Sequence, residues 1–86
     1  MFILSKDKNT LVNCNNIANM SMQKGTIYPS TDYWRIIVMY PAVEEDVLYD
    51  TLDEFRTEKE CRDVFNKLCC RIVGGNENEI IDMNDL

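Results

Sequence analysis

"TEKECRDVFNKLCCRIVGG", residues 57–75, is the stretch that decides the fold, because it predicts one amphipathic helix. Thr57 followed by Glu60 is a capping-box pattern, which marks a helix start. Gly74 and Gly75 are expected to end the helix, since glycine adopts a left-handed cap at little cost. The apolar residues recur at helical spacing and share one side: Cys61, Val64, Phe65, Leu68, Cys69 and Ile72. Such a helix needs an apolar layer to pack against.

The first half of the chain predicts strands that supply this layer. "IANMSMQ" alternates apolar and polar side chains from Ala18, as a half-buried strand does. "YWRIIVMY" is rich in β-branched and aromatic residues and is the clearest strand of the chain. Residues 24–32 contain Gly25 and Pro29 and predict a loop. The strands are expected at residues 2–5, 10–14, 17–23, 33–40 and 47–55, with the first two forming a hairpin.

The strand at residues 33–40 is apolar on both faces. Alternate residues from Trp34 to Tyr40 are expected to meet the helix. One helix covers only one face of a sheet, so the second face requires another cover. We therefore expect a candidate interaction surface, covered by a second copy of the chain or by another protein, at Tyr33, Arg35, Ile37 and Met39.

These elements predict an α+β fold, in which a curved antiparallel sheet of four to five strands carries one C-terminal helix packed on one face. The 86 residues suit one small domain, expected at residues 1–75. Residues 76–86 form an acidic C-terminal tail with four acidic side chains and no basic one. This tail is either frayed or docked through its apolar residues, which are Ile80, Ile81, Met83 and Leu86.

Charge and hydropathy limit the kinds of molecule that the protein is expected to bind. The formal charge is −6, from 15 acidic and 9 basic side chains, which disfavours direct binding to nucleic acid. The acidic excess serves either solubility or binding to a basic protein surface. No stretch approaches the roughly 20 apolar residues of a membrane span, and "MFILSKDK" is not a signal peptide. We expect a cytoplasmic protein with reduced thiols and no membrane contact.

The four cysteines are expected to be structural for the most part. Cys61 and Cys69 belong to the apolar side of the helix and predict buried hydrophobic side chains. Cys70 points away from that side and is a candidate reactive thiol, although the nearby helix C-terminus opposes thiolate formation. The chain has no histidine and no Cys-x-x-Cys pair, so neither a zinc site nor a histidine-activated nucleophile is expected. We expect no enzyme activity, no metal and no cofactor.

Three segments carry a resemblance: "FILSKDKNTLVNCNNIANM", "WRIIVMY" and "FRTEKECRDVFNKL". Together they resemble small uncharacterised proteins of Firmicutes and their prophages. Those proteins share an "ILS.D...LVN..NI" β-hairpin opening, an aromatic and β-branched strand, and a single C-terminal helix. The resemblance covers about residues 2–72. It implies the α+β fold and a bacterial, prophage or mobile-element origin, but it assigns no catalytic or ligand-binding residue.

Three functional hypotheses remain at this point. The first is a non-enzymatic interaction or oligomerisation module, encoded by a prophage or mobile element. The second is an acidic inhibitor that mimics nucleic acid and occupies a DNA-binding protein. The third is a thiol-dependent redox protein acting through Cys70. The second hypothesis requires that carboxylates gather on one face, and its candidates are Glu44, Glu45, Asp46, Asp50, Asp53 and Glu54.

Overall fold

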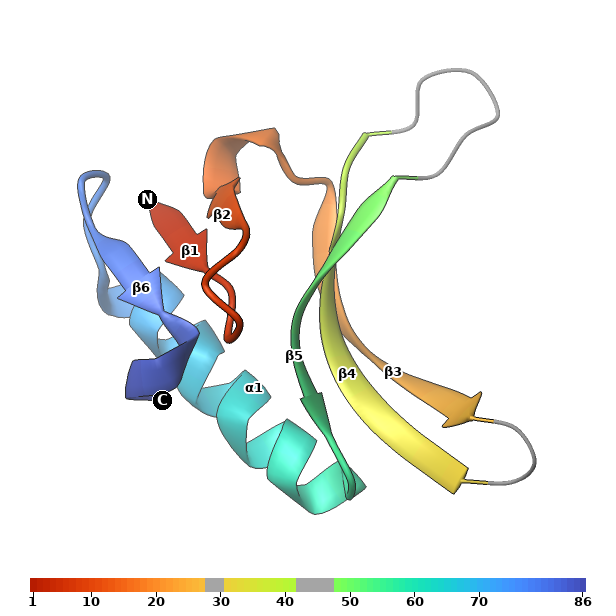
Figure 1. Cartoon of the computed structure of the whole chain (residues 1–86). Helices are drawn as coiled ribbons and strands as arrows, with labels where there is room; N and C mark the ends of the chain where they lie inside the picture. The colour runs from red at the N-terminus through yellow and green to blue at the C-terminus, as the bar shows by residue number, and fades with distance from the viewer. Residues whose placement is uncertain (28–30, 42–47) are drawn as a thin grey trace.

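The structure, a computed structural model, describes residues 1–27, 31–41 and 48–86. Within these residues it is an α+β fold with one helix and two three-stranded sheets (Figure 1). The helix is α1 (Glu58–Gly74), and two 3-10 turns are η1 (Cys14–Asn16) and η2 (Met83–Asp85). The strands are β1 (Phe2–Leu4), β2 (Leu11–Asn13), β3 (Asn19–Ile27), β4 (Thr31–Met39), β5 (Tyr49–Phe55) and β6 (Ile80–Asp82).

Both predicted ends of α1 are confirmed, but the C-terminal cap differs from the prediction. The Thr57 hydroxyl accepts a hydrogen bond of 3.2 Å from the backbone N–H of Glu60. At the other end, Gly75 is extended, with φ −89° and ψ 177°, and does not form a left-handed cap. Glycine is required there by space, because a Cβ on Gly75 would lie 2.8 Å from the carbonyl oxygen of Arg71.

The apolar side of α1 enters the core as predicted. Cys61 and Leu68 are fully buried, and Val64, Phe65 and Ile72 pack against the same cluster. Cys69, at the margin of the apolar side, is only half-buried. The helix therefore holds the core through one row of side chains, and the loss of a large one should leave a cavity.

The larger sheet has the strand order β3-β4-β5, is antiparallel, and packs one face on α1 (Figure 1). Ile36 and Val38 are fully buried in the core beside Trp34 and Tyr40, which confirms the predicted helix-facing side of β4. The ladder between β4 and β5 shifts register after Ile36, so that Leu52 is an extra residue in β5.

The predicted single sheet of four to five strands is wrong, because the chain builds a second sheet with the order β2-β1-β6. The expected hairpin of β1 and β2 is present. After it, Asn13 accepts a 3.0 Å hydrogen bond from the N–H of Asn15, and the resulting turn η1 separates β2 from β3. The free edge of β1 then pairs in parallel with β6.

The predicted loop at residues 24–32 is also shorter than expected. β3 runs to Ile27 and β4 begins at Thr31, so Gly25 lies inside a strand. The ring of Tyr33, directly opposite on β4, lies over Gly25, and a Cβ there would collide with Tyr33 Cζ. The aromatic ring thus fills the space that the missing side chain leaves, which lets the strand continue through a residue that normally weakens it.

The C-terminal tail is docked, which resolves the alternative left open by the sequence. Ile81 and Met83 are fully buried and belong to the same core cluster as the helix. Ile80 points the other way and is 59% exposed. An ion pair of 2.9 Å between Arg71 and Glu79 joins the tail to the end of α1. Residues 80–83 therefore complete the core.

We predict that Leu68→Ala lowers the free energy of unfolding by about 2–5 kcal/mol, because it leaves a cavity in the core. Urea denaturation followed by circular dichroism measures the change. Val73→Ala on the same helix is the matched control, since Val73 is 88% exposed and its loss should cost less than about 0.5 kcal/mol. Equal losses in the two variants would contradict the helix orientation.

We predict that Ile81→Ala destabilises the protein by about 2–5 kcal/mol, whereas Ile80→Ala is nearly neutral. The two residues are chemically identical neighbours in β6, and only Ile81 is buried. Thermal melts of both variants make the comparison. A nearly unchanged melt for Ile81→Ala would show that the tail does not contribute to the core.

Candidate functional site

The candidate site is the face of the larger sheet that points away from α1, called the outer face from here on. Its residues alternate with the core-facing ones along each strand. The predicted interaction residues of β4 lie on it together with neighbours from both adjacent strands. The outer face comprises Ser21 and Gln23 of β3, Tyr33, Arg35, Ile37 and Met39 of β4, and Tyr49, Thr51 and Glu54 of β5, with Glu54 directly opposite Arg35 in the ladder.

Arg35 is the centre of this face and contacts both neighbouring strands. Its Nη2 donates a hydrogen bond of 3.3 Å to the side-chain oxygen of Gln23 on β3. On the other side, its Cζ lies 5.0 Å from the ring centroid of Tyr49 on β5, which is a cation–π distance. Its Nε is buried and has no hydrogen-bond partner in the part of the chain that the structure describes. The guanidinium of Arg35 thus contacts a side chain on each of the two neighbouring strands.

Ile37, one of the predicted interaction residues, is buried within the chain and is not itself accessible to a partner in this structure. It is 1% exposed, although α1, the helix of the described residues, packs on the other side of the sheet. Ile37 pairs with Thr51, and the contact between Arg35 and Tyr49 passes diagonally over this pair. The long Arg35 side chain therefore covers Ile37 from the solvent side, as amphipathic side chains commonly do.

Of the remaining predicted residues, Tyr33, Arg35 and Met39 are half-buried. Tyr33 is engaged over Gly25. Among the described aromatic side chains the most open is Tyr49, 49% exposed, which sequence reasoning missed. Strict alternation would place Tyr49 on the same face as Phe55, which packs against the core. The extra residue at Leu52 reverses the alternation, so nothing in the local pattern could reveal Tyr49 as an outer-face residue.

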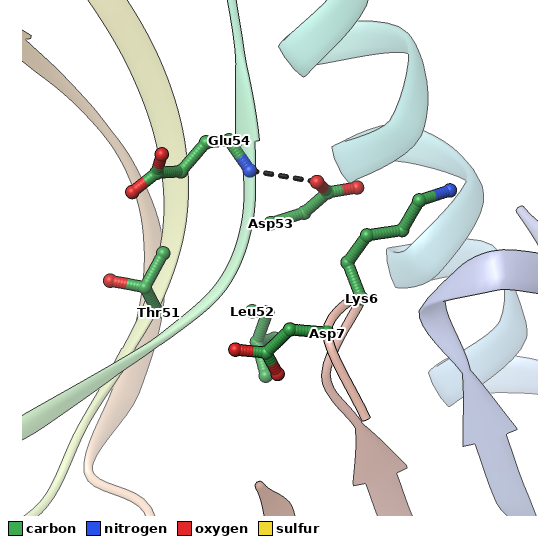
Figure 2. A pocket seen from close by; sticks show the side chains of 6 residues that line it. All are labelled: Lys6, Asp7, Thr51, Leu52, Asp53 and Glu54. Atoms are coloured by element: carbon green, nitrogen blue, oxygen red, sulfur yellow. Dashed lines mark hydrogen bonds between the residues drawn. The ribbon is translucent and has the colours of Figure 1, made fainter. Parts of the chain in front are cut away.

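A second feature is a hollow of about 360 Å³ where the β1–β2 turn meets β5 (Figure 2). The backbone N–H of Lys6 donates a 2.8 Å hydrogen bond to the carbonyl oxygen of Leu52, at the bulge. Figure 2 shows Asp53 and Glu54 pointing to opposite sides of β5. The hollow is lined by Lys6, Asp7, Thr51, Leu52, Asp53 and Glu54.

Two of the three carboxylates that line this hollow, those of Asp7 and Asp53, accept hydrogen bonds. Asp7 accepts hydrogen bonds from the hydroxyl of Ser5 at 2.6 Å and the N–H of Asn9 at 2.9 Å, and these lower its pKa. Burial raises the pKa of Asp53, while the 2.7 Å hydrogen bond from the N–H of Glu54 opposes the shift. The hydrogen bonds of Asp7 thus stabilise the turn, and the backbone hydrogen bond from Lys6 to Leu52 holds the turn against β5.

Three of the four thiols are poorly suited to nucleophilic chemistry. Burial raises the pKa of Cys61 to about 11, and burial also raises the pKa of Cys14 and Cys69. A raised pKa depletes the thiolate, which is the reactive form. Cys70 is exposed and lines a hollow with Arg71 and other residues of α1 and the C-terminus. Its reactivity stays a prediction.

The carboxylates expected for nucleic-acid mimicry do not gather in the part of the chain that the structure describes. Residues 44–46 lie outside that part. Asp50 accepts a 2.6 Å hydrogen bond from the hydroxyl of Tyr40, whose pKa is raised to about 12 by burial and by this contact. Asp53 and Glu54 diverge (Figure 2). Asp50, Asp53 and Glu54 therefore do not form one acidic surface.

Comparison of the chain with protein-family models, with curated proteins and with solved structures finds no match. Across residues 1–27, 31–41 and 48–86, no group of three or more His, Cys, Asp or Glu side chains is arranged to hold a metal ion. The same residues include no helix that combines the length and the apolar character of a membrane crossing. The function is therefore inferred from the geometry of the outer face.

We predict that Asp53→Asn stabilises the protein at pH 7, because it removes a partly desolvated charge and keeps an oxygen for the N–H of Glu54. The folded-state pKa of Asp53 is raised, so its ionised form costs stability above that pKa and the cost disappears as the pH falls toward 3.8. Urea midpoints of the variant and the wild type should thus converge as the pH is lowered.

Asp7→Asn is the control for this prediction and should shift stability in the opposite direction. The folded-state pKa of Asp7 is lowered, so its contribution is present above 3.8 and is lost as the pH falls through the lowered value. We expect Asp7→Asn to be less stable than the wild type at pH 7. The same sign for both variants would contradict the two environments described for these carboxyl groups.

Proposed function

We propose that the protein is a non-enzymatic interaction module that binds another protein through its outer face. The observation that carries this proposal is the pairing of the Arg35 guanidinium with the exposed ring of Tyr49. Arginine and tyrosine are the residue types that dominate binding energy at protein interfaces, and methionine is enriched there. Met39, directly opposite Tyr49 in the ladder, adds a half-buried apolar contact.

The pre-arrangement of Arg35 also supports the proposal. Long side chains lose rotamer freedom when they bind, and this loss reduces affinity. Arg35 is already held by Gln23 and Tyr49 before any partner arrives. The partner surface that fits best is apolar at its centre, to cover Tyr49 and Met39, with a carbonyl or carboxylate oxygen to accept from the guanidinium.

Neither alternative hypothesis receives comparable support from the described residues. Mimicry of nucleic acid needs a row of carboxylates, and Asp53 and Glu54 point to opposite sides of β5. A thiol-dependent function would have to use Cys70 alone among the cysteines, since the pKa of each of the other three is raised. The interaction module therefore remains the proposal.

We predict that Tyr49→Ala reduces binding of the partner about tenfold or more, because it removes an exposed aromatic anchor. The test immobilises the wild-type chain, captures proteins from cells of its source, and compares recovery on the variant by mass spectrometry. Leu11→Ala is the matched control, since Leu11 is 54% exposed on β2 of the other sheet. Partners retained equally by both variants would place binding outside the outer face.

A further inference from the structure

The edges of the two sheets differ in how well they are protected against pairing with another chain. An edge strand presents unpaired backbone N–H and C=O groups, and natural proteins blunt such edges. The strand orders place β2 and β6 at the edges of the smaller sheet, and β3 and β5 at the edges of the larger one. Each of these four edges can be compared for strand length, bulges, charge and cover.

Three of the four edges are blunted. β2 and β6 are only three residues long. β5 is interrupted by the bulge at Leu52, and the N–H of Lys6 already occupies the Leu52 carbonyl oxygen at 2.8 Å. Short strands, bulges and covering loops are the devices that prevent edge-to-edge association.

Within residues 1–27, 31–41 and 48–86, β3 shows none of these three devices. It is nine residues long, it pairs with β4 without a register shift, and it contains no proline. Its single charged side chain, Lys24, lies 3.2 Å from Asp32 of β4 and is therefore drawn toward its own sheet. Figure 1 shows the lower half of β3 on the side of β4 that faces away from β5 and α1.

β3 also lacks the acidic side chains that give the chain its negative charge. The chain carries a formal charge of −6 with 15 acidic side chains, so two copies generally repel each other. β3 has the sequence "NMSMQKGTI" and contains no acidic residue. Two copies that meet along β3 would thus bring no carboxylate of this strand against another. This favours a second copy of the chain as the occupant of the edge.

We propose that two copies of the chain associate by antiparallel pairing of their β3 strands about a two-fold axis. The pair forms one continuous six-stranded sheet, with both copies of β3 at its centre. Nine residues at about 3.4 Å each give a shared edge of about 30 Å. Antiparallel pairing is self-complementary, so each free N–H of one edge meets a free C=O of the identical edge of the other copy.

The side chains of β3 are compatible with this arrangement. In a two-fold antiparallel pair, residues directly opposite one another point to the same side of the sheet. Met20 and Met22 are half-buried on the helix side of β3 and pack at the margin of the core. Pairing brings them against the helix-side residues of the second β3, which removes further apolar surface from water. Ser21 and Gln23 of β3 also belong to the outer face, but the pairing uses the backbone edge of β3 and neither Arg35 nor Tyr49, so this inference does not depend on the proposed function.

Hydrogen exchange and sedimentation test the wild-type chain directly. A dimer has a mass of about 20 kDa, twice the 10.1 kDa of the chain, and sedimentation equilibrium should detect it with rising concentration. Amide exchange followed by NMR should show concentration-dependent protection at alternate residues of β3, and none on β2 or β6. A 10.1 kDa species up to about 1 mM, or β3 amides that do not respond to concentration, overturns the proposal.

Two double variants locate the interface. Asn19→Lys with Ser21→Lys places positive charges along the β3 edge and should raise the dimer dissociation constant about tenfold or more. Leu11→Lys with Ile80→Lys adds the same charge and removes two exposed apolar side chains from the edges of the other sheet, and it should leave the constant within about twofold. The reverse pattern places the contact on the smaller sheet and overturns the proposal.

The proposed dimer and the proposed partner binding fail in different experiments. Tyr49→Ala should leave the dimer intact, since Tyr49 lies on β5, separated from β3 by β4. Dissociation of the dimer by Tyr49→Ala would show that copies meet through the outer face, and it would overturn pairing through β3. Loss of partner capture with an unchanged dimer supports both assignments.

Discussion

The β-bulge at Leu52 is the local feature on which the two sheets and the outer face all depend. It gives β5 one residue more than the ladder needs, and the freed carbonyl oxygen accepts from Lys6 of the β1–β2 turn. The same extra residue reverses the alternation along β5, so Phe55 packs on the core and Tyr49 points outward. One irregular residue thus joins the sheets and sets which aromatic ring the outer face presents.

The β1–β2 turn is rigid enough to make this junction effective. Ser5 is buried, and its hydroxyl donates to Asp7 and accepts from the N–H of Thr10. From the other side, the side-chain amide of Asn84 donates a 3.0 Å hydrogen bond to the carbonyl oxygen of Lys6. The turn is therefore held by β5 and by the C-terminal segment together, which explains why a tail that looks dispensable in sequence is part of the folded core.

The larger sheet presents two different surfaces for binding. Its outer face binds through side chains, with Arg35 held between Gln23 and Tyr49. This face suits a partner with an apolar centre and an oxygen atom that accepts from the guanidinium. Its β3 edge presents backbone N–H and C=O groups and suits a strand, for which a second copy is a partner of matching length that brings no carboxylate on its own β3. The two surfaces adjoin at Ser21 and Gln23, and a dimer formed through β3 would place two outer faces on one continuous sheet.

The sequence by itself determined what depends on neighbouring residues: the capped helix from Thr57, its buried side at Cys61 and Leu68, the first hairpin, and the helix-facing side of β4. Only the tertiary structure decided what depends on segments far apart in the chain. Pairing of β1 with β6, 78 residues away at Phe2 and Ile80, splits the strands into two sheets. The bulge in β5 and the cover that Arg35 gives to Ile37 are likewise set by cross-strand packing. Spacing along the chain records which side of an element is apolar, but it does not record which distant edge or side chain will meet it.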